Sequence, residues 1–418
     1  MAEALSVLTG LVFLIIVGIL VSLFARKINI SNVLLLLVVG LIIGNISQAY
    51  GLIEISGIAI VTIAIIALVI IVFDGASRFE IKALDDFSVK SLKLIGMFLL
   101  LCMIILPFFV NIMFFEGITT INILYSLIFA AIAVSTDPAT VFITLKNKTN
   151  KVVELIKVEA LLNTPIVVLL PFLILDIIGQ IGGEAVLNWE VYLAGFMNQI
   201  VIGIGSGILV GIIFFKGMRK FYSEQISPLA IVGAALLAYV LAENLGGNGV
   251  LSVAVLGFMF GNMYLSHKEN LLEFSGMISN SLEILVFMML GLIVVLDDIT
   301  LLFVLKSIMI FILILIARYL AARITLSKGE FNKKNIWFIA LSMPKGIAVA
   351  VLVFSLILLG EPELVIIGEV LVIVMLLSIL LSTVVTRFSK RLIDMDEEEP
   401  RDASKKKRAE DDLELPSV

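Results

Sequence analysis

The stretch VSTDP at residues 134–138 decides how this chain can fold, because it places an aspartate followed by a proline inside a long apolar run. A short basic turn follows, and the next apolar run carries EALLNTP at residues 159–165. An ionised aspartate at a bilayer centre costs about 2.5 to 3.5 kcal/mol on insertion scales, and proline removes a backbone donor and disturbs the preceding turn. So costly a pair inside a membrane helix indicates a functional site.

The composition is typical of a membrane protein with many helices. Of 418 residues, 61% are hydrophobic and 15% are charged, whereas soluble domains have roughly 25% charged residues. The net charge of -5 lies in loops and a tail, so it points to no nucleic-acid partner. The first apolar run has no basic region before it and is long enough to span a bilayer, which predicts a first transmembrane helix and not a cleaved signal.

Windows of about 20 apolar residues predict about thirteen transmembrane helices, and hence an all-α polytopic membrane protein. We expect a transmembrane domain at residues 1–393, followed at 394–418 by a cytoplasmic tail whose charged composition predicts disorder. The least certain division between helices lies at 243–249. The expected segments are 4–24, 31–49, 54–73, 92–115, 121–145, 152–178, 191–215, 227–244, 248–265, 275–296, 299–322, 335–359 and 364–388.

The charges in the loops predict the orientation of these segments. Loops after odd-numbered segments contain lysine or arginine, whereas the six connections after even-numbered segments contain neither. Because cytoplasmic loops carry an excess of Lys and Arg, we expect the N-terminus outside and the C-terminus in the cytoplasm. The expected location is the cell membrane.

Thirteen segments predict an inverted repeat, in which segments 1–6 and 8–13 correspond. Segment five, interrupted at Asp137-Pro138, then corresponds to segment twelve, whose interior carries Pro344, Lys345 and Gly346. Broken helices at corresponding positions of two halves indicate a transporter's site near the midplane, where the two breaks cross.

Residue counting places the polar residues of these segments at similar depths. A rise of 1.5 Å per residue puts Asp137 roughly 13 Å, Asn163 and Thr164 roughly 18 Å, and Lys345 roughly 16 Å from the cytoplasmic end. Glu159 lies one turn from Asn163 on the same helix face. Its expected partner is Lys345 or Arg318, in a structural ion pair, although Arg318 is placed where it could instead snorkel to the surface.

Three further polar residues allow two interpretations each. Asp74, beside Arg78, is either a solvated loop acid or a second carboxylate at the mouth of an inward-facing funnel. Asn280 and Glu283 are interpreted first as helix-packing contacts and second as residues of an ion pathway.

Several motifs resemble the cation:proton antiporter superfamily, in particular its NhaP-like branch of archaeal and bacterial sodium/proton exchangers. Thr136-Asp137-Pro138 is similar to the family's unwound motif, and residues 159–165 resemble its E-x-x-x-N-D-P stretch. Pro344-Lys345-Gly346 falls where the family has a basic residue before glycine, and the glycine-rich 246–257 region resembles the family's eighth-to-ninth helix region. The resemblance covers almost the whole membrane region.

This resemblance implies thirteen helices, a mobile six-helix core, a homodimer and exchange by alternating access. Asp137 would then bind the alkali cation or the proton, with Thr136, Asn163 and Thr164 as further candidate ligands. Glu159 would pair with Lys345, and Asn163 would brace that pair. The partners are monovalent cations, protons and the lipid bilayer, and no cofactor is expected.

One residue departs from the family's pattern and leaves a second function open. Thr164 stands where the family has an aspartate. A hydroxyl can coordinate a cation, but at neutral pH it cannot take up and release a proton as a carboxylate does. The first hypothesis is antiport of Na+, K+ or Li+ against protons, one for one, with Asp137 as the shared carboxylate. The alternative is a passive cation channel, a uniporter or a degenerate regulatory member. A solute symporter is a third possibility, but no excess of polar or aromatic residues would line its cavity.

The sequence contains no pattern typical of an enzyme. It has one cysteine and one histidine, and we find neither a catalytic triad nor a phosphate-binding glycine loop. We therefore expect a transporter and not an enzyme.

Overall fold

The structure is a computed structural model, and it is almost entirely helical. It describes residues 2–28, 31–50, 57–78, 86–115, 117–137, 140–141, 145, 148–181, 189–220, 222–264, 267–294, 300–326, 331–387 and 396–397. The helices are α1 (Ala2–Ile28), α2 (Asn32–Tyr50), α3 (Gly57–Ser77), α4 (Asp86–Phe114), α5 (Thr120–Ala133), α7 (Lys151–Ile181), α8 (Trp189–Lys220), α9 (Ser227–Asn244), α10 (Gly249–Asn262), α11 (Lys268–Ile293), α12 (Leu301–Leu326), α13 (Lys333–Leu341), α14 (Ile347–Leu358) and α15 (Pro362–Arg387).

Eight of the described helices are long and apolar enough to cross a membrane. Their outer faces carry large exposed apolar side chains, such as Leu20 on α1 and Ile212 on α8, which a bilayer would solvate. α2, α5, α10 and α14 contain shorter apolar stretches. The prediction of a polytopic α-helical membrane protein is confirmed, whereas the number of thirteen crossings and the inverted repeat stay predictions.

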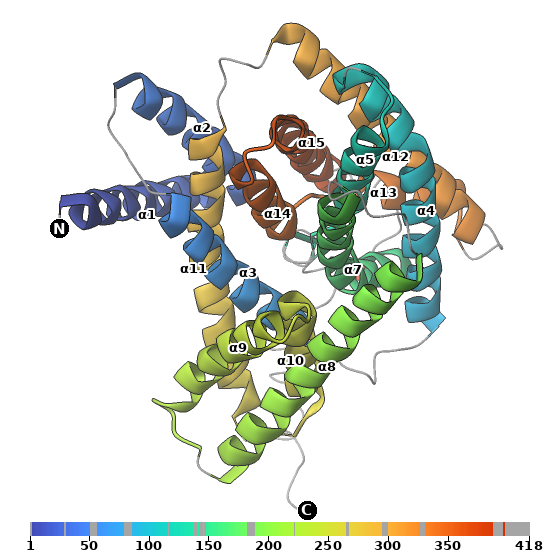
Figure 1. The fold of residues 1–418 in the computed structure, drawn as a ribbon. Coiled ribbons are helices and arrows are strands. Elements are labelled where there is room, and N and C mark those ends of the chain that lie inside the picture. Colours follow the sequence, from blue (N-terminus) through green and yellow to red (C-terminus); the bar gives the residue numbers. More distant parts are fainter. Residues whose placement is uncertain are drawn as a thin grey trace, which may run out of the picture.

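The helices form two groups in Figure 1. In the core group, α4, α5 and α7 pack against one another and contact α12, α13, α14 and α15. In the flanking group, α11 lies against α1, α2 and α3, and α10 packs against α3, α8 and α9. The groups meet where α14 contacts α3 and α11, where α7 contacts α3 and α10, and where α15 contacts α2.

Local sequence explains where several helices begin and end. Thr119, Asn248 and Asn332 accept a backbone hydrogen bond at the starts of α5, α10 and α13, as N-cap side chains do. The uncertain division at 243–249 is real, because Gly246 there has a φ of +75°, a left-handed conformation that glycine tolerates.

Two short strands connect the loop before α7 with the tail. β1 (Lys148–Thr149) pairs antiparallel with β2 (Asp396–Glu397). Sequence reasoning did not anticipate this pairing. The other residues of the tail lie outside the described part of the chain, so their disorder stays a prediction.

Candidate functional site

The first interruption of a helix follows α5 and is organised by Asp137. α5 ends at Ala133, and residues 135–137 are not helical. The Thr140 N–H donates to Oδ2 of Asp137 at 2.8 Å, and the Val141 N–H donates to the Asp137 carbonyl at 3.1 Å. Asp137 thus caps the short turn that follows, much as an N-cap does. Pro138, expected to cause this break, lies outside the described residues.

The second interruption separates α13 from α14 and lies directly against the first. Residues 342–346 are not helical. The Asp137 N–H donates to the Pro344 carbonyl at 2.8 Å, and the Lys345 N–H donates to Oγ of Ser378 on α15 at 3.0 Å. The structure therefore brings together the two breaks that the sequence places in different halves of the chain. Sequence reasoning missed Ser378, because one serine in an apolar helix gives no signal of its own.

The ends of the broken helices face opposite charges. The Lys345 ammonium donates to the carbonyls of Ala133 and Ser135, at the carboxyl end of α5. The Asp137 carboxylate lies against Gly346, the N-cap residue of α14. A helix carries partial negative charge at its C-terminus and partial positive charge at its N-terminus. Each of the two side chains therefore faces a helix end of opposite charge. This arrangement compensates the charges of two buried side chains, since Lys345 is 1% exposed and Asp137 is 5% exposed.

Gly346→Ala is expected to disturb the site directly. A Cβ atom at Gly346 would lie 2.0 Å from Cγ of Asp137 and 2.2 Å from its Oδ1, so the carboxylate would have to move. We expect a loss of about 1 to 3 kcal/mol of stability from overpacking, together with slower transport. Melting temperature in detergent and flux in proteoliposomes measure the two effects. Gly96→Ala on α4 is the matched control, because nothing lies within 4 Å of its added Cβ; equal effects of both variants would contradict the prediction.

Glu159 forms its ion pair with Arg318 and not with Lys345. Arg318 Nη1 donates to Oε1 at 3.1 Å and Nη2 to Oε2 at 2.6 Å, with both side chains fully buried. The pairing with Lys345 that the resemblance implies is therefore wrong, because the Lys345 ammonium is occupied by carbonyl groups. The alternative in which Arg318 snorkels to the surface is also wrong, because α12 continues to Leu326, about two turns beyond this residue. Its guanidinium instead lies 4.9 Å from the ring centre of Phe98.

α7 connects this ion pair to the first interruption. Thr136 Oγ1 donates to Oε1 of Glu159 at 3.3 Å, and Nδ2 of Asn163 donates to the Val134 carbonyl at 2.7 Å. Asn163 thus braces the backbone of the break and not the expected pair of Glu159 with Lys345. The side chain of Thr164 lies outside the described residues.

Two buried oxygen atoms beside these contacts lack a hydrogen-bond partner among the described residues. They are Oδ1 of Asn163 and Oγ of Ser342, on side chains 0% and 4% exposed. Buried polar atoms are nearly always satisfied, so these two oxygen atoms, one on α7 and one in the second break, are available to a bound ion or water.

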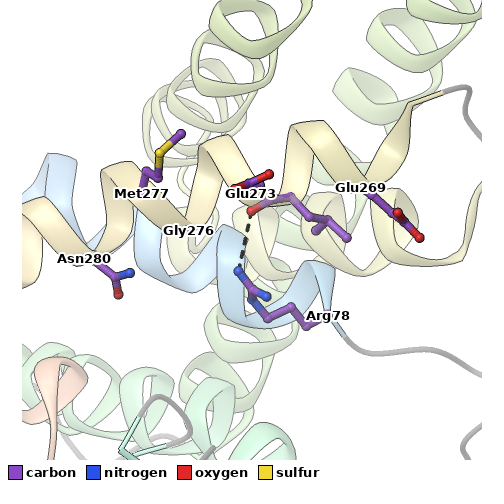
Figure 2. Close-up of a pocket in the computed structure, with 7 residues that line it drawn as sticks. Arg78, Glu269, Glu273, Gly276, Met277 and Asn280 are labelled. Atoms are coloured by element: carbon purple, nitrogen blue, oxygen red, sulfur yellow. Dashed lines mark hydrogen bonds between the residues drawn. The ribbon is translucent and has the colours of Figure 1, made fainter. Parts of the chain in front are cut away.

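Asp74 belongs to a different part of the molecule. Its carboxylate accepts from Nη2 of Arg78 at 2.9 Å and from Nε at 3.1 Å. Arg78 also donates to the Leu272 carbonyl on α11 at 3.5 Å, the dashed line in Figure 2. This places Asp74 beside a pocket of about 460 Å³ and not among the contacts that surround Asp137 in the described structure. The pocket is lined by Arg78, Glu269, Leu272, Glu273, Gly276, Met277 and Asn280.

Chemically, the two breaks offer one buried carboxylate together with hydroxyl, amide and carbonyl oxygens. Hard oxygen ligands of this kind suit alkali cations, and a carboxylate oxygen accepts a proton equally well. A proton and a monovalent cation can therefore compete for Asp137.

Comparison with known proteins shows what this arrangement is similar to. The sequence model of a family described as "Sodium/hydrogen exchanger, transmembrane" matches residues 11–390. The chain is 28% identical over 369 residues to the "K(+)/H(+) antiporter NhaP" of Alkalimonas amylolytica, covering 85% of this chain and 60% of that protein. It is 35% identical over 135 residues to the "Low-affinity Na(+)/H(+) antiporter NhaS1" of Synechocystis sp., covering 32% of this chain and 25% of that protein. The chain thus spans only part of the length of the curated relatives it matches.

A solved structure has the same fold. The sodium proton antiporter MjNhaP1 from Methanocaldococcus jannaschii superimposes with a TM-score of 0.77, covering 93% of this chain and 98% of that one. Sequence identity over the match is 21%, so this similarity shows the fold.

Proposed function

The chain belongs to the sodium/hydrogen exchanger family, and from this premise we propose that it exchanges a monovalent cation for protons across a membrane by alternating access. The observation that carries the proposal is the direct contact of the two helix breaks at Asp137, whose N–H donates to the Pro344 carbonyl at 2.8 Å. In this proposal Asp137 is the shared carboxylate that holds the proton and the cation in turn. The family is one of transporters and not of enzymes, and the transported ions are its substrates.

The surroundings of Asp137 support a role as ion carrier. Its carboxylate lies at the N-terminus of α14, whose partial positive charge faces it. Thr136 lies in the same break as Asp137, and Asn163 lies on the adjacent helix α7. We propose these two residues, with Thr164, as further cation ligands. The buried pair of Glu159 and Arg318 holds α7 to α12 and so keeps these ligands in position.

Both sodium and potassium are proposed substrates. One matched relative is named a K(+)/H(+) antiporter and another a low-affinity Na(+)/H(+) antiporter. Both ions are monovalent and bind hard oxygen ligands, such as the one carboxylate and the neutral oxygens of this site. Lithium is the third ion to test.

We further propose the orientation and assembly. The loop charges support an N-terminus outside and a cytoplasmic C-terminus, with residues 1–393 in the membrane domain. A homodimer and a disordered tail at residues 394–418 complete the proposal.

The wild-type protein is expected to exchange one cation for one proton without net charge movement. Purified protein would be reconstituted into proteoliposomes containing a pH-sensitive dye, and an inward gradient of Na+ or K+ imposed. Because one carboxylate carries either ion, the lumen should become more alkaline as the cation enters and protons leave, at a rate that does not depend on the membrane potential. Empty liposomes and a choline gradient serve as controls.

Two results would contradict the proposal. Cation uptake without proton movement would instead favour a channel or uniporter. Exchange whose rate follows the membrane potential would exclude one-for-one stoichiometry.

A further inference from the structure

The helices α12 and α13 form a hairpin with two aromatic rings between them. They follow one another across a short connection and pack together. Tyr319 on α12 and Trp337 on α13 have ring centroids 4.4 Å apart and an interplanar angle of 31°. The Trp337 side chain is 48% exposed, so the ring pair reaches the outer surface of the core group. Exposed tryptophan and tyrosine rings on membrane helices are typical of the zone between lipid tails and headgroups.

Three basic residues lie one turn from this ring pair, toward the connection between the helices. Arg323 follows Tyr319 by four positions on α12, and Lys333 precedes Trp337 by four positions on α13. Because residues four apart share a helix face, both helices carry positive charge on the same side of the rings. Lys334, three positions before Trp337, adds a third charge to that face. All three basic side chains are exposed.

Neighbouring carboxylates do not balance this charge. Among the described residues, no salt bridge or hydrogen bond occupies the side chains of Arg323, Lys333 and Lys334. Residues 323–334 contain four basic residues, the fourth being Lys328, and one acidic residue, Glu330. The stretch therefore has an excess of three positive charges, which favours an anionic partner.

The surroundings of the three charges fit a lipid better than a soluble anion. Anionic headgroups at a membrane surface attract basic clusters that lie next to membrane helices. Leu320 and Ile324, on α12 beside the charges, are exposed apolar side chains that acyl chains would cover. A phosphate ion in solution would use the positive charges but would leave this apolar surface and the exposed Trp337 ring uncovered.

We propose that Arg323, Lys333 and Lys334 bind the phosphate of an anionic phospholipid, with the ring pair of Tyr319 and Trp337 beside its glycerol and upper acyl chains. The proposal does not depend on the proposed exchange function. The lipid would lie on the two helices that support the transport site. α12 carries the arginine that pairs with Glu159, and α13 leads directly into the second break.

The test is quenching of Trp337 fluorescence by brominated lipids. The chain has two tryptophans, so Trp189→Phe leaves Trp337 as the single fluorophore of this kind. This protein would be reconstituted in phosphatidylcholine bilayers that contain equal mole fractions of either brominated phosphatidylglycerol or brominated phosphatidylcholine. We expect phosphatidylglycerol to be enriched about fivefold at Trp337, the factor by which one lysine or arginine near an anionic surface strengthens binding.

Two triple variants in this background separate the site from the general charge of the protein. The site variant should be quenched equally by both lipids, whereas the control variant, which removes three exposed basic residues from α1, α4 and α8, should keep the preference. Both lose the same charge, and all six positions are exposed. The site variant is Arg323→Gln/Lys333→Gln/Lys334→Gln, and the control is Lys27→Gln/Lys93→Gln/Lys216→Gln.

Three results would overturn the proposal. The first is equal quenching by both lipids before the site is changed. The second is a preference that survives in the site variant or is lost equally in both triple variants. The third is loss of the preference when inorganic phosphate is added at constant ionic strength, which would assign the site to free phosphate. Failure of the proposed exchange would affect none of these measurements, because quenching requires no transport.

Discussion

Asp137→Asn is expected to abolish proton-coupled cation exchange while leaving the fold intact. Asparagine has almost the same shape, and its Oδ1 can still accept from the Thr140 N–H, whose bond to Asp137 is 2.8 Å long. An amide cannot hold a proton in exchange for a cation at neutral pH, so the cycle loses its only proposed carrier. Proton flux in proteoliposomes under a Na+ or K+ gradient measures the loss.

The controls for this variant separate chemistry from folding. The melting temperature in detergent should remain close to that of the wild type, because the hydrogen bond and the packing are kept. Glu154→Gln, at an exposed carboxylate on α7, should transport normally. Coupled flux that survived in Asp137→Asn would rule out this residue as the shared carrier.

Arg318→Met is expected to produce the largest loss of stability. It leaves the Glu159 carboxylate fully buried without its bidentate partner. Breaking such a pair from one side costs about 3 to 5 kcal/mol, whereas replacing both partners by apolar residues is often neutral. The double variant Glu159→Leu/Arg318→Met should therefore recover most of the stability that the single variant loses.

The melting temperature in detergent ranks these variants by stability. Arg323→Met is the matched control, since this arginine lies on the same helix but is exposed. Arg318→Lys should fall between wild type and Arg318→Met, because an ammonium keeps the charge but lacks the planar fork. If the double variant melted no higher than Arg318→Met, the loss would come from packing, such as the contact with Phe98, and not from the unpaired charge.

The helix breaks could be predicted from sequence because their causes are local. Asp137-Pro138 and Pro344-Lys345-Gly346 each combine a helix-breaking residue with a charge in an apolar run, and the interruptions lie there. The division between α9 and α10, the least certain one in the sequence, lies where its glycines had placed it. The long apolar stretches gave most helix positions to within a few residues.

The partner of Glu159 could not be predicted, because residue counting gives depth and not position around a helix bundle. Lys345 and Arg318 were both near the depth of Glu159, and the sequence could not say which helix faces it. The expected end of the segment at residue 322 also placed Arg318 too close to the surface, whereas α12 ends at Leu326.

The hydrogen bonds between the two breaks have a mechanical consequence. The Lys345 ammonium holds the carbonyls of Ala133 and Ser135, more than 200 residues away in sequence, and Asp137 holds the Pro344 carbonyl. Any rearrangement that keeps these bonds must carry both breaks as one rigid body, together with α7 and α12, which the buried ion pair clamps together. The sliding surface of such a motion would then be the border between the core group and the flanking group, where α14, α7 and α15 meet α2, α3, α10 and α11.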